Sequence, residues 1–511
     1  MAKALMLFSL ALLFIISFPP DSASSSRIFA HDDDDHDMTT KRSLVSPTER
    51  LIRALNLFPS RAVNIVNDST IGLDGSFEHG PRLVEKRFKF PNADYSLSSS
   101  TDSTPTTGDL GHHAGYFSLK NTYGARMFYF FFESRNNSKQ APVVIWLSGG
   151  PGCSSSIALF YENGPFKVND QLNLVWNTYG WDQASNILFV DQPVGTGFSY
   201  TNDSRDFRHD ENGISNDLYS FMQAFFAAHP DYAKNDFYIT GESYAGHYVP
   251  AFASRINEGN RAGKGIKINL KGIAIGNGLT NSGIQYPAYP DFALQTKLID
   301  KSSYNEIMQI VPSCQNAIKL CGTNGTDTCS QALNICEDIF ESILQDGPEN
   351  LNYYDIRKQC EGSLCYDFSN LGRYLSQQSV KTALGVGNID WIPCSNTVYD
   401  NLQDDWMRDL AVGIPALLEQ EIQVLIYAGE DDLICNWLGN SRWVHAMEWS
   451  GKPKFASASE VPFQVDGSSA GVLTKYGPLS FLKINNAGHM VPMDQPKAAL
   501  EMLDRFVKGA L

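Results

Sequence analysis

The residues around Ser243 have the types and spacing that expose a nucleophilic serine. An apolar run at 237–240 leads into the sequence Gly-Glu-Ser-Tyr-Ala-Gly-His-Tyr at 241–248. A sharp turn that exposes a serine hydroxyl between a strand and a helix leaves little space for side chains two positions before and after it. Gly241 meets this demand, whereas Ala245 stands where glycine is usual, so the G-x-S-x-G pattern is met only approximately. An ordinary turn between a strand and a helix is the alternative.

A glycine-rich stretch follows a second apolar run at 143–147. Its sequence, Ser-Gly-Gly-Pro-Gly-Cys-Ser-Ser at 148–155, exposes backbone N–H groups that side chains do not cover. Such groups stabilise a developing oxyanion, and hydrolases of this kind take one donor from such a loop and one from the residue after the nucleophile. Gly150 and Tyr244 are therefore the candidate oxyanion donors. A phosphate-binding loop is the alternative, but this stretch lacks the lysine of the G-x-x-x-x-G-K-[ST] pattern.

Two later apolar runs also end in polar residues that could complete a catalytic triad. One ends in Glu430, Asp431 and Asp432, and the other leads to His489. Serine, acid and histidine in this chain order are typical of hydrolases in which serine attacks, histidine moves the proton and the acid orients the imidazole. The residues alone leave the three neighbouring acids as alternatives. A single histidine after a strand is often structural, but here three separate loops indicate the same chemistry.

Short apolar runs predict the strands that must position these loops. They end in glycine, proline or polar residues, and they cover 143–147, 187–190, 237–240, 273–275, 424–427 and 479–484. Such runs are typical of strands buried on both faces of a parallel sheet. Residues 217–228 and 496–507 have apolar residues at helical spacing, so the alternation predicts an α/β sheet with crossover helices.

The strand pattern stops between about residues 281 and 392. Six of the nine cysteines lie in this stretch. We therefore expect a helical, disulfide-rich cap at 281–392, inserted between two parts of a sheet domain at 86–280 and 393–511. A zinc site is the alternative, but the cysteines form no C-x-x-C pair and their spacing fits nested disulfides better. The odd number of cysteines leaves at least one free thiol.

The N-terminus has the order of a secretory signal. Lys3 precedes an apolar run at 4–18, which two prolines and a stretch of small residues at 22–26 follow. The run is shorter than the roughly 20 residues that span a bilayer, so we predict a signal peptide at 1–24 rather than a stable membrane anchor. Residues 25–85 contain an acidic block and then a basic, helix-like piece. We interpret them as a propeptide.

Composition and charge exclude several classes of protein. The chain has 511 residues, of which 43% are hydrophobic and 19% charged, so it is globular rather than a coiled coil, a collagen or a disordered chain. Its 40 basic and 56 acidic residues give a net charge of −16, which argues against a nucleic acid partner. We expect no metal and no cofactor. Glycosylation sequons occur at Asn67, Asn136, Asn202 and Asn324.

Taken together, these motifs resemble the serine carboxypeptidases, most closely the plant type III members. The resemblance extends from about residue 85 to the C-terminus and is carried by 146–155, 241–248, 434–437 and 488–492. It implies an α/β-hydrolase fold with a central, mostly parallel sheet, and a triad of Ser243, Asp432 and His489. Asp432 is favoured over its neighbours because it stands three residues before the Cys-Asn-Trp motif, as in the family pattern.

The resemblance also implies a site for the free C-terminal carboxylate of a peptide, formed by Trp146, Ser148, Glu162 and Glu242. Most family members carry asparagine at the position of Ser148, whose hydroxyl can donate a hydrogen bond but has a shorter reach. Two glutamates can bind an anion only if at least one holds a proton, so acidic pH should favour peptide binding. The pocket for the leaving residue should lie beside Cys435 and Met490.

The same resemblance pairs Cys153 with Cys394, Cys314 with Cys336, Cys321 with Cys329, and Cys360 with Cys365, and it leaves Cys435 free. The activity that it implies is removal of C-terminal residues from peptides and proteins in acid, in the vacuole or outside the cell. An acyltransferase with the same triad is the alternative. A non-enzymatic partner that stabilises another secreted protein is a third possibility, and the intact set of triad residues argues against it as the only role.

Overall fold

The computed structural model describes residues 84–87, 89–91, 112–322, 328–361 and 364–511. The predicted signal peptide and almost all of the predicted propeptide lie outside these residues, as do the sequons at Asn67 and Asn324. Among the helices that are described, none is both long and apolar enough to cross a membrane. The same part of the chain holds no group of three or more His, Cys, Asp and Glu residues suited to a metal ion.

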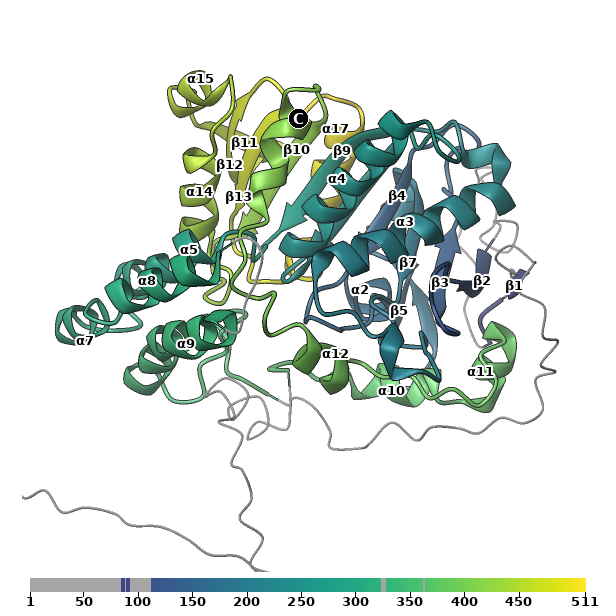
Figure 1. The fold of residues 1–511 in the computed structure, drawn as a ribbon, viewed down its shortest axis with the longest axis horizontal. Helices are drawn as coiled ribbons and strands as arrows, with labels where there is room; N and C mark the ends of the chain where they lie inside the picture. The colour runs from purple at the N-terminus through teal and green to yellow at the C-terminus, as the bar shows by residue number, and fades with distance from the viewer. Residues whose placement is uncertain (1–83, 88, 92–111, 323–327, 362–363) are drawn as a thin grey trace, which may run out of the picture. The chain divides into compact units, whose positions relative to one another are not determined.

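Within the described residues, eleven strands form one mixed sheet in the order β1-β2-β3-β7-β4-β8-β9-β10-β13-β12-β11 (Figure 1). The consecutive pairs from β7 to β13 are parallel, and the pairs outside this central part are antiparallel. The strands are β1 Val84–Arg87, β2 His112–Ser118, β3 Arg126–Phe132, β4 Val143–Leu147, β7 Asn186–Val190, β8 Phe237–Glu242, β9 Leu270–Gly276, β10 Gln423–Gly429, β11 Val461–Val465, β12 Ser468–Tyr476 and β13 Leu479–Ile484. A separate hairpin joins β5 Phe166–Val168 to β6 Leu174–Trp176.

Helices cover both faces of the sheet, so its central strands are buried on both sides. Val143 and Ile145 of β4 pack in the apolar core that α3 and α4 cover, whereas Val144 packs in the core formed with α2 and α17. Successive side chains of a strand point to opposite faces, which explains why the run at 143–147 is apolar without interruption. The helices on the sheet are α2 Ser156–Tyr161, α3 Glu211–Ala228, α4 Ala245–Ala262, α13 Ile414–Leu418, α14 Trp437–Ala446, α15 Lys452–Ala456, α16 Val491–Asp494 and α17 Pro496–Val507.

The chain between β9 and β10 is helical and is cross-linked by disulfides. Besides α13, its α-helices are α5 Ser282–Gln285, α6 Tyr289–Gln295, α7 Lys301–Ile307, α8 Val311–Cys321, α9 Thr328–Asp346, α10 Ser369–Leu375, α11 Gln378–Leu384 and α12 Asn396–Asn401. Of these, α7, α8 and α9 project to one side of the sheet (Figure 1). Four disulfides join Cys153 with Cys394, Cys314 with Cys336, Cys321 with Cys329, and Cys360 with Cys365, and Cys435 is free. These are the pairs that the resemblance implies.

The predicted parallel strands and crossover helices are confirmed. β4, β13 and α17 have the predicted bounds. Helix α3 begins earlier than predicted, at Glu211, because the Asp210 side chain caps it by accepting a hydrogen bond from the Gly213 N–H. The antiparallel strands at the two edges of the sheet were not predicted, since sequences such as Arg-Met-Phe-Tyr-Phe-Phe-Phe in β3 lack an apolar–polar alternation. Strand β1 runs across the predicted end of the propeptide at residue 85.

The end of β10 touches the loop that follows β13. A Cβ atom added at Gly429, the last residue of β10, would lie 2.1 Å from the Gly488 carbonyl oxygen and 2.4 Å from the Ala487 carbonyl oxygen. Both of these atoms belong to the backbone, which cannot move aside as a side chain can. Glycine at 429 is therefore required for the two loops to lie side by side.

We predict that Gly429→Ala lowers the free energy of unfolding by about 1–3 kcal/mol, the usual cost of overpacking a buried site. The matched control is Gly372→Ala in α10, where an added Cβ would meet only one Trp391 ring atom at 4.0 Å. The midpoint of thermal unfolding should fall for the first variant and stay constant or rise for the second. Equal midpoints for the two variants would contradict this account.

Candidate active site

Ser243 stands in a strained turn between β8 and α4. Its backbone φ is 66°, in the left-handed region that residues other than glycine rarely adopt. The surrounding chain holds it there, since the Ser243 N–H donates to the Gly276 carbonyl at 3.1 Å and its own carbonyl accepts from Gly246 at 2.9 Å and from Leu279 at 3.0 Å. Such strain is typical of functional sites, where surrounding contacts fix an otherwise unfavourable backbone.

The turn accepts alanine at the second glycine position of the motif but not at the first. A Cβ added at Gly241 would lie 2.5 Å from the Leu147 carbonyl oxygen and 2.7 Å from the Ala245 Cβ. The methyl group of Ala245 therefore occupies the space between the two positions. Position 241 must remain glycine, whereas position 245 accepts a methyl group.

His489 and Asp432 form a buried pair at the ends of β13 and β10. The His489 Nδ1 lies 2.9 Å from the Asp432 Oδ2, and both side chains are buried. The backbone N–H of His489 also donates to the Tyr354 carbonyl at 2.7 Å. An imidazole that donates its Nδ1–H to a carboxylate keeps Nε2 free to accept a proton. His489 and Ser243 line the same cavity.

The two neighbouring acids are engaged elsewhere. A carboxylate oxygen of Glu430 accepts from the Asn486 N–H at 2.8 Å, and the Asp431 carboxylate lies 3.3 Å from the Arg357 Nε. Of the three adjacent acids, Asp432 is the one that the structure places against the imidazole of His489.

The glycine-rich loop packs directly against the serine turn. A Cβ added at Gly149 would lie 2.4 Å from the Tyr244 nitrogen, so the two backbones approach as closely as glycine allows. Gly150 and Tyr244 both line the cavity. Across the described residues, neither of their N–H groups has a hydrogen-bond acceptor. Both groups are therefore available to an oxygen atom bound beside Ser243.

Glu162 and Glu242 form a buried acid pair next to the serine. Glu162 follows α2, Glu242 is the last residue of β8, and their carboxyl groups are hydrogen-bonded to each other. Burial raises the pKa of Glu162 to about 8. Burial and the adjacent charge of Glu162 raise the pKa of Glu242 well above its usual value. The pair therefore retains a proton in acidic and neutral solution.

Ser148 lies at the cavity with this pair, and Trp146, which is fully buried and not among the lining residues, contacts Ser148. The Trp146 indole N–H donates to the Ser148 Oγ at 3.1 Å, and its ring packs edge-on against Trp181 with 5.2 Å between centroids. Ser148 lines the cavity together with both glutamates. The serine hydroxyl thus accepts from the indole and can donate its own hydrogen toward the cavity.

The rest of the cavity wall is mostly apolar and aromatic. Cys435 and Met490 belong to it, and burial raises the pKa of the Cys435 thiol well above its usual value, so the thiol stays protonated. Further lining residues are Leu279, Tyr286, Tyr289, Glu337, Phe340, Tyr353, Tyr354, Leu364, Tyr366, Phe368, Tyr399, Trp406 and Ile434. Many of them come from the helical insertion, which therefore forms part of the cavity.

Comparison with known proteins relates this site to one family. The serine carboxypeptidase family profile matches residues 103–509. Serine carboxypeptidase-like 49 of Arabidopsis thaliana is 57% identical over 511 residues, which cover 100% of this chain and 96% of that protein. Serine carboxypeptidase 3 of Oryza sativa subsp. japonica is 60% identical over 464 residues, which cover 91% of this chain and 89% of that protein.

The chain belongs to the serine carboxypeptidase family. Among solved structures it resembles Kex1(delta)p, a prohormone-processing carboxypeptidase from Saccharomyces cerevisiae, with a TM-score of 0.71 and 27% sequence identity over 78% of this chain and 92% of that one. The fold is thus the α/β-hydrolase fold, and the protein is a serine-type carboxypeptidase that acts on peptides.

One residue of this carboxypeptidase site was missed by sequence reasoning. The Asn277 Nδ2 donates to the Asp432 Oδ2 at 2.7 Å, and its Oδ1 accepts from the Gly429 N–H at 3.0 Å. Asn277 follows β9 directly, between two glycines. A polar residue at the carboxyl end of a predicted parallel strand was the signal that could have found it.

We predict that Asn277→Ala lowers kcat about ten-fold or more. Asp432 loses the donor of a charge-assisted hydrogen bond worth roughly 1.5–3 kcal/mol, and it then orients His489 less well. The matched control is Asn186→Ala, which removes a buried asparagine that bonds Ser134 and Ala141, far along the chain from the triad. Steady-state kinetics and thermal unfolding should show lost stability in both variants but lost kcat only in the first. Equal kcat in the two variants would refute this role of Asn277.

Proposed function

We propose that the protein is a secretory-pathway carboxypeptidase that hydrolyses the C-terminal bond of peptides and proteins in acid through a triad of Ser243, His489 and Asp432. One observation carries the proposal: Ser243 and His489 share their cavity with the buried acids Glu162 and Glu242. A peptide that is cleaved at its last bond has its free carboxylate one residue beyond the scissile bond. Protonated acids beside the nucleophile can bind such a carboxylate.

In the first half-reaction, the Ser243 Oγ bonds to the scissile carbonyl carbon while the His489 Nε2 takes the hydroxyl proton. The carbonyl oxygen becomes an oxyanion, and the N–H groups of Gly150 and Tyr244 donate to it. The C–N bond then breaks, and His489 gives its proton to the leaving amino group. The C-terminal amino acid departs and the remaining peptide is esterified to Ser243.

In the second half-reaction, a water molecule takes the place of the amino group. His489 removes a proton from the water, whose oxygen bonds to the ester carbon. The C–O bond to Ser243 breaks, and the proton returns to the Ser243 oxygen. The free carboxyl group of the shortened peptide is the product, and the enzyme is restored.

The acid pair and its neighbours give exopeptidase selectivity in this proposal. A protonated carboxyl of Glu162 or Glu242 donates to the substrate carboxylate, and the Ser148 hydroxyl adds a second donor. Trp146 orients that hydroxyl through its indole N–H. Cys435 and Met490 form part of the pocket for the side chain of the leaving residue. An amide-capped peptide lacks the charge that this site binds and is a poor substrate.

The first test is release of the C-terminal amino acid from N-blocked dipeptides between pH 4 and pH 8. The processed protein should release it, most strongly in acid, whereas Ser243→Ala and an amide-capped substrate should give no more than background. No release by folded, processed protein from a broad peptide panel would overturn the proposal. Acyl transfer from a glucose ester by the same protein would then identify the acyltransferase alternative.

The pKa directions predict a specific pH dependence of KM. Loss of the proton from Glu162 near pH 8 places a second negative charge beside the substrate carboxylate, so KM should rise at least about ten-fold between pH 6 and pH 9. In Glu162→Gln the amide donates at every pH, and the rise should be much smaller. A blocked ester substrate is the control, since its KM should stay nearly constant. A parallel rise for the ester would contradict this assignment.

We further propose the domain arrangement and route predicted from the sequence. Residues 1–24 act as a signal peptide, 25–85 as a propeptide and 281–392 as a cap on a sheet domain formed by 86–280 and 393–511. The mature enzyme works in the vacuole or outside the cell. Asn136 and Asn202 are exposed, which supports their use as glycosylation sites.

A further inference from the structure

The side chain of Tyr244 is fixed at both its ring and its hydroxyl group. The hydroxyl donates to the Asp405 Oδ2 at 3.0 Å. The ring is buried and stacks on the His247 ring, with 4.6 Å between the ring centroids and 16° between the ring planes. It also contacts the Trp406 ring. Since the Tyr244 N–H adjoins Ser243, contacts that fix the side chain also restrict the direction of this N–H group.

Asp405 is a buried acid that the proposed reaction does not use. Its side chain is fully buried, and its second oxygen lies 3.4 Å from the Arg408 guanidinium. Burial, together with the Asp405 charge, raises the pKa of the neighbouring Glu211 well above its usual value, so Glu211 stays neutral beside it. Buried ion pairs often add little to stability because desolvation offsets the attraction. Stability is therefore a weak explanation for a carboxylate at this position.

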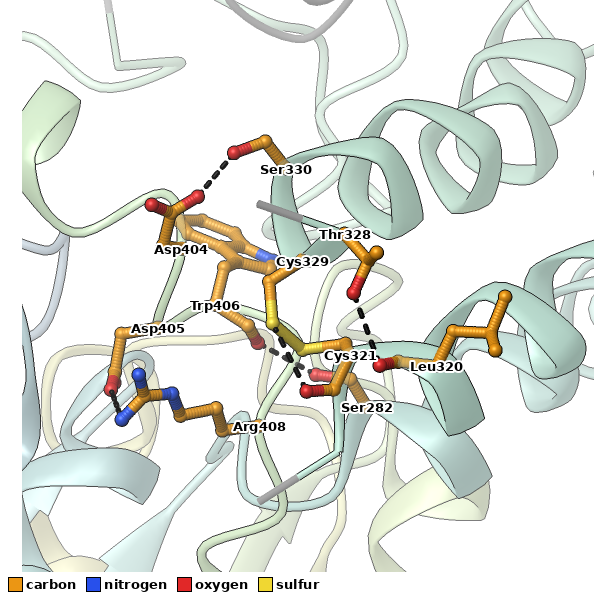
Figure 2. Close-up of a disulfide and its surroundings, with 10 residues drawn as sticks. All are labelled: Ser282, Leu320, Cys321, Thr328, Cys329, Ser330, Asp404, Asp405, Trp406 and Arg408. Atoms are coloured by element: carbon orange, nitrogen blue, oxygen red, sulfur yellow. Dashed lines mark hydrogen bonds and ion pairs between the residues drawn. A yellow bond between two sulfur atoms is a disulfide. The ribbon is translucent and has the colours of Figure 1, made fainter. Parts of the chain in front are cut away.

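The segment that carries Asp405 is held by the helical insertion (Figure 2). The Ser330 hydroxyl on α9 donates to the Asp404 carboxylate, and the Ser282 hydroxyl on α5 donates to the Trp406 carbonyl at 2.9 Å. The disulfide of Cys321 and Cys329 joins α8 to α9 beside these contacts. Contacts on both sides of Asp405 thus fix its backbone.

A second tyrosine, Tyr248 in α4, contacts the glycine-rich loop that carries Gly150. Tyr248 stands four residues after Tyr244, the N-cap residue of α4, so the two side chains lie on one side of the start of this helix. The Tyr248 hydroxyl accepts a hydrogen bond from the Gly152 N–H at 3.3 Å. One side of the start of α4 therefore contacts both the glycine-rich loop and the Asp405 segment.

We propose that Asp405 is a positioning residue of the oxyanion hole. Its carboxylate holds the Tyr244 hydroxyl, and this contact keeps the Tyr244 N–H directed at the developing oxyanion. The inference rests on the proposed function, in which that N–H is one of the two donors. Asp405 lies across the Tyr244 ring from the backbone that meets the substrate, so it acts through Tyr244 and takes no part in proton transfer.

The test compares Tyr244→Phe, Asp405→Asn and the double variant with matched controls. Tyr238→Phe removes a buried hydroxyl that donates to the Val507 carbonyl at 3.1 Å, and Asp217→Asn removes a buried acid paired with Arg208 at 2.6 Å. Loss of an oxyanion donor costs about 10²–10³ in kcat, and a misdirected donor costs less, so we expect kcat to fall about ten-fold in each test variant with KM nearly unchanged.

The double variant separates positioning from general stabilisation. Asp405→Asn weakens the contact, because an amide oxygen still accepts but carries no charge, whereas Tyr244→Phe removes it. A second change at Asp405 then has no contact left to break, so the double variant should lose no more kcat than Tyr244→Phe alone. The controls should lose thermal stability without losing kcat. Additive losses, a changed KM with constant kcat, or unchanged kcat in Tyr244→Phe would each overturn the inference. If Asp405→Asn fails to fold, the kcat of Tyr244→Phe compared with that of Tyr238→Phe tests the inference.

A second readout does not depend on peptide cleavage. With a fluorophosphonate probe, the Ser243 Oγ bonds to phosphorus, fluoride leaves and the serine proton passes through His489 to solvent, while the phosphoryl oxygen takes the oxyanion position. The labelling rate should fall about ten-fold in both test variants and stay constant in the controls. A wild-type protein that is labelled but cleaves no peptide would refute the proposed function and leave this comparison valid. Equal labelling rates in all variants would refute the role of Asp405.

Discussion

One buried carboxylate, that of Asp432, joins the strand ends on which the site depends. Its Oδ2 accepts hydrogen bonds from the His489 imidazole, the Asn277 amide and the Cys435 N–H. Moving a charge out of water costs several kcal/mol unless hydrogen bonds replace the water, so these donors must be present together. They come from the loops after β9, β10 and β13, which are neighbours in the sheet. The order of the strands is thus required to bring these three donors to one carboxylate.

Glu162 and Glu242 are buried as Asp432 is, but they have fewer hydrogen-bond donors. Asp432 accepts three hydrogen bonds, all on Oδ2, whereas the carboxyl groups of Glu162 and Glu242 have each other. Without donors, burial favours the protonated form, which raises the pKa of both glutamates. The two glutamates that line the cavity with Ser243 therefore keep a proton. In the proposed function this proton lets the pair bind an anion, while Asp432 orients the imidazole of His489.

Much of the fold and of the candidate site could be predicted because it depends on local patterns. The apolar runs of the parallel strands, the turn at Ser243 and the chain order of the triad are all contained in short segments. The partners of these segments could not be predicted in the same way. Asn277 acquires its role only because β9 pairs with β10, and Asp405 meets Tyr244 across 161 positions of the chain. The disulfide pairs followed from the family resemblance, since cysteine spacing alone allows many pairings.

The helical insertion holds the loops that carry His489 and Asp432, and it also lines the cavity. The His489 N–H donates to the Tyr354 carbonyl at 2.7 Å, and the Ile434 N–H donates to the Tyr353 carbonyl at 3.0 Å. Adjacent peptide groups of the insertion thus hold the loops that carry the histidine and the aspartate. A cap that swung away as one rigid body would break both bonds and separate the triad from its support. In the proposed mechanism, substrate therefore reaches Ser243 while residues 353 and 354 stay in place.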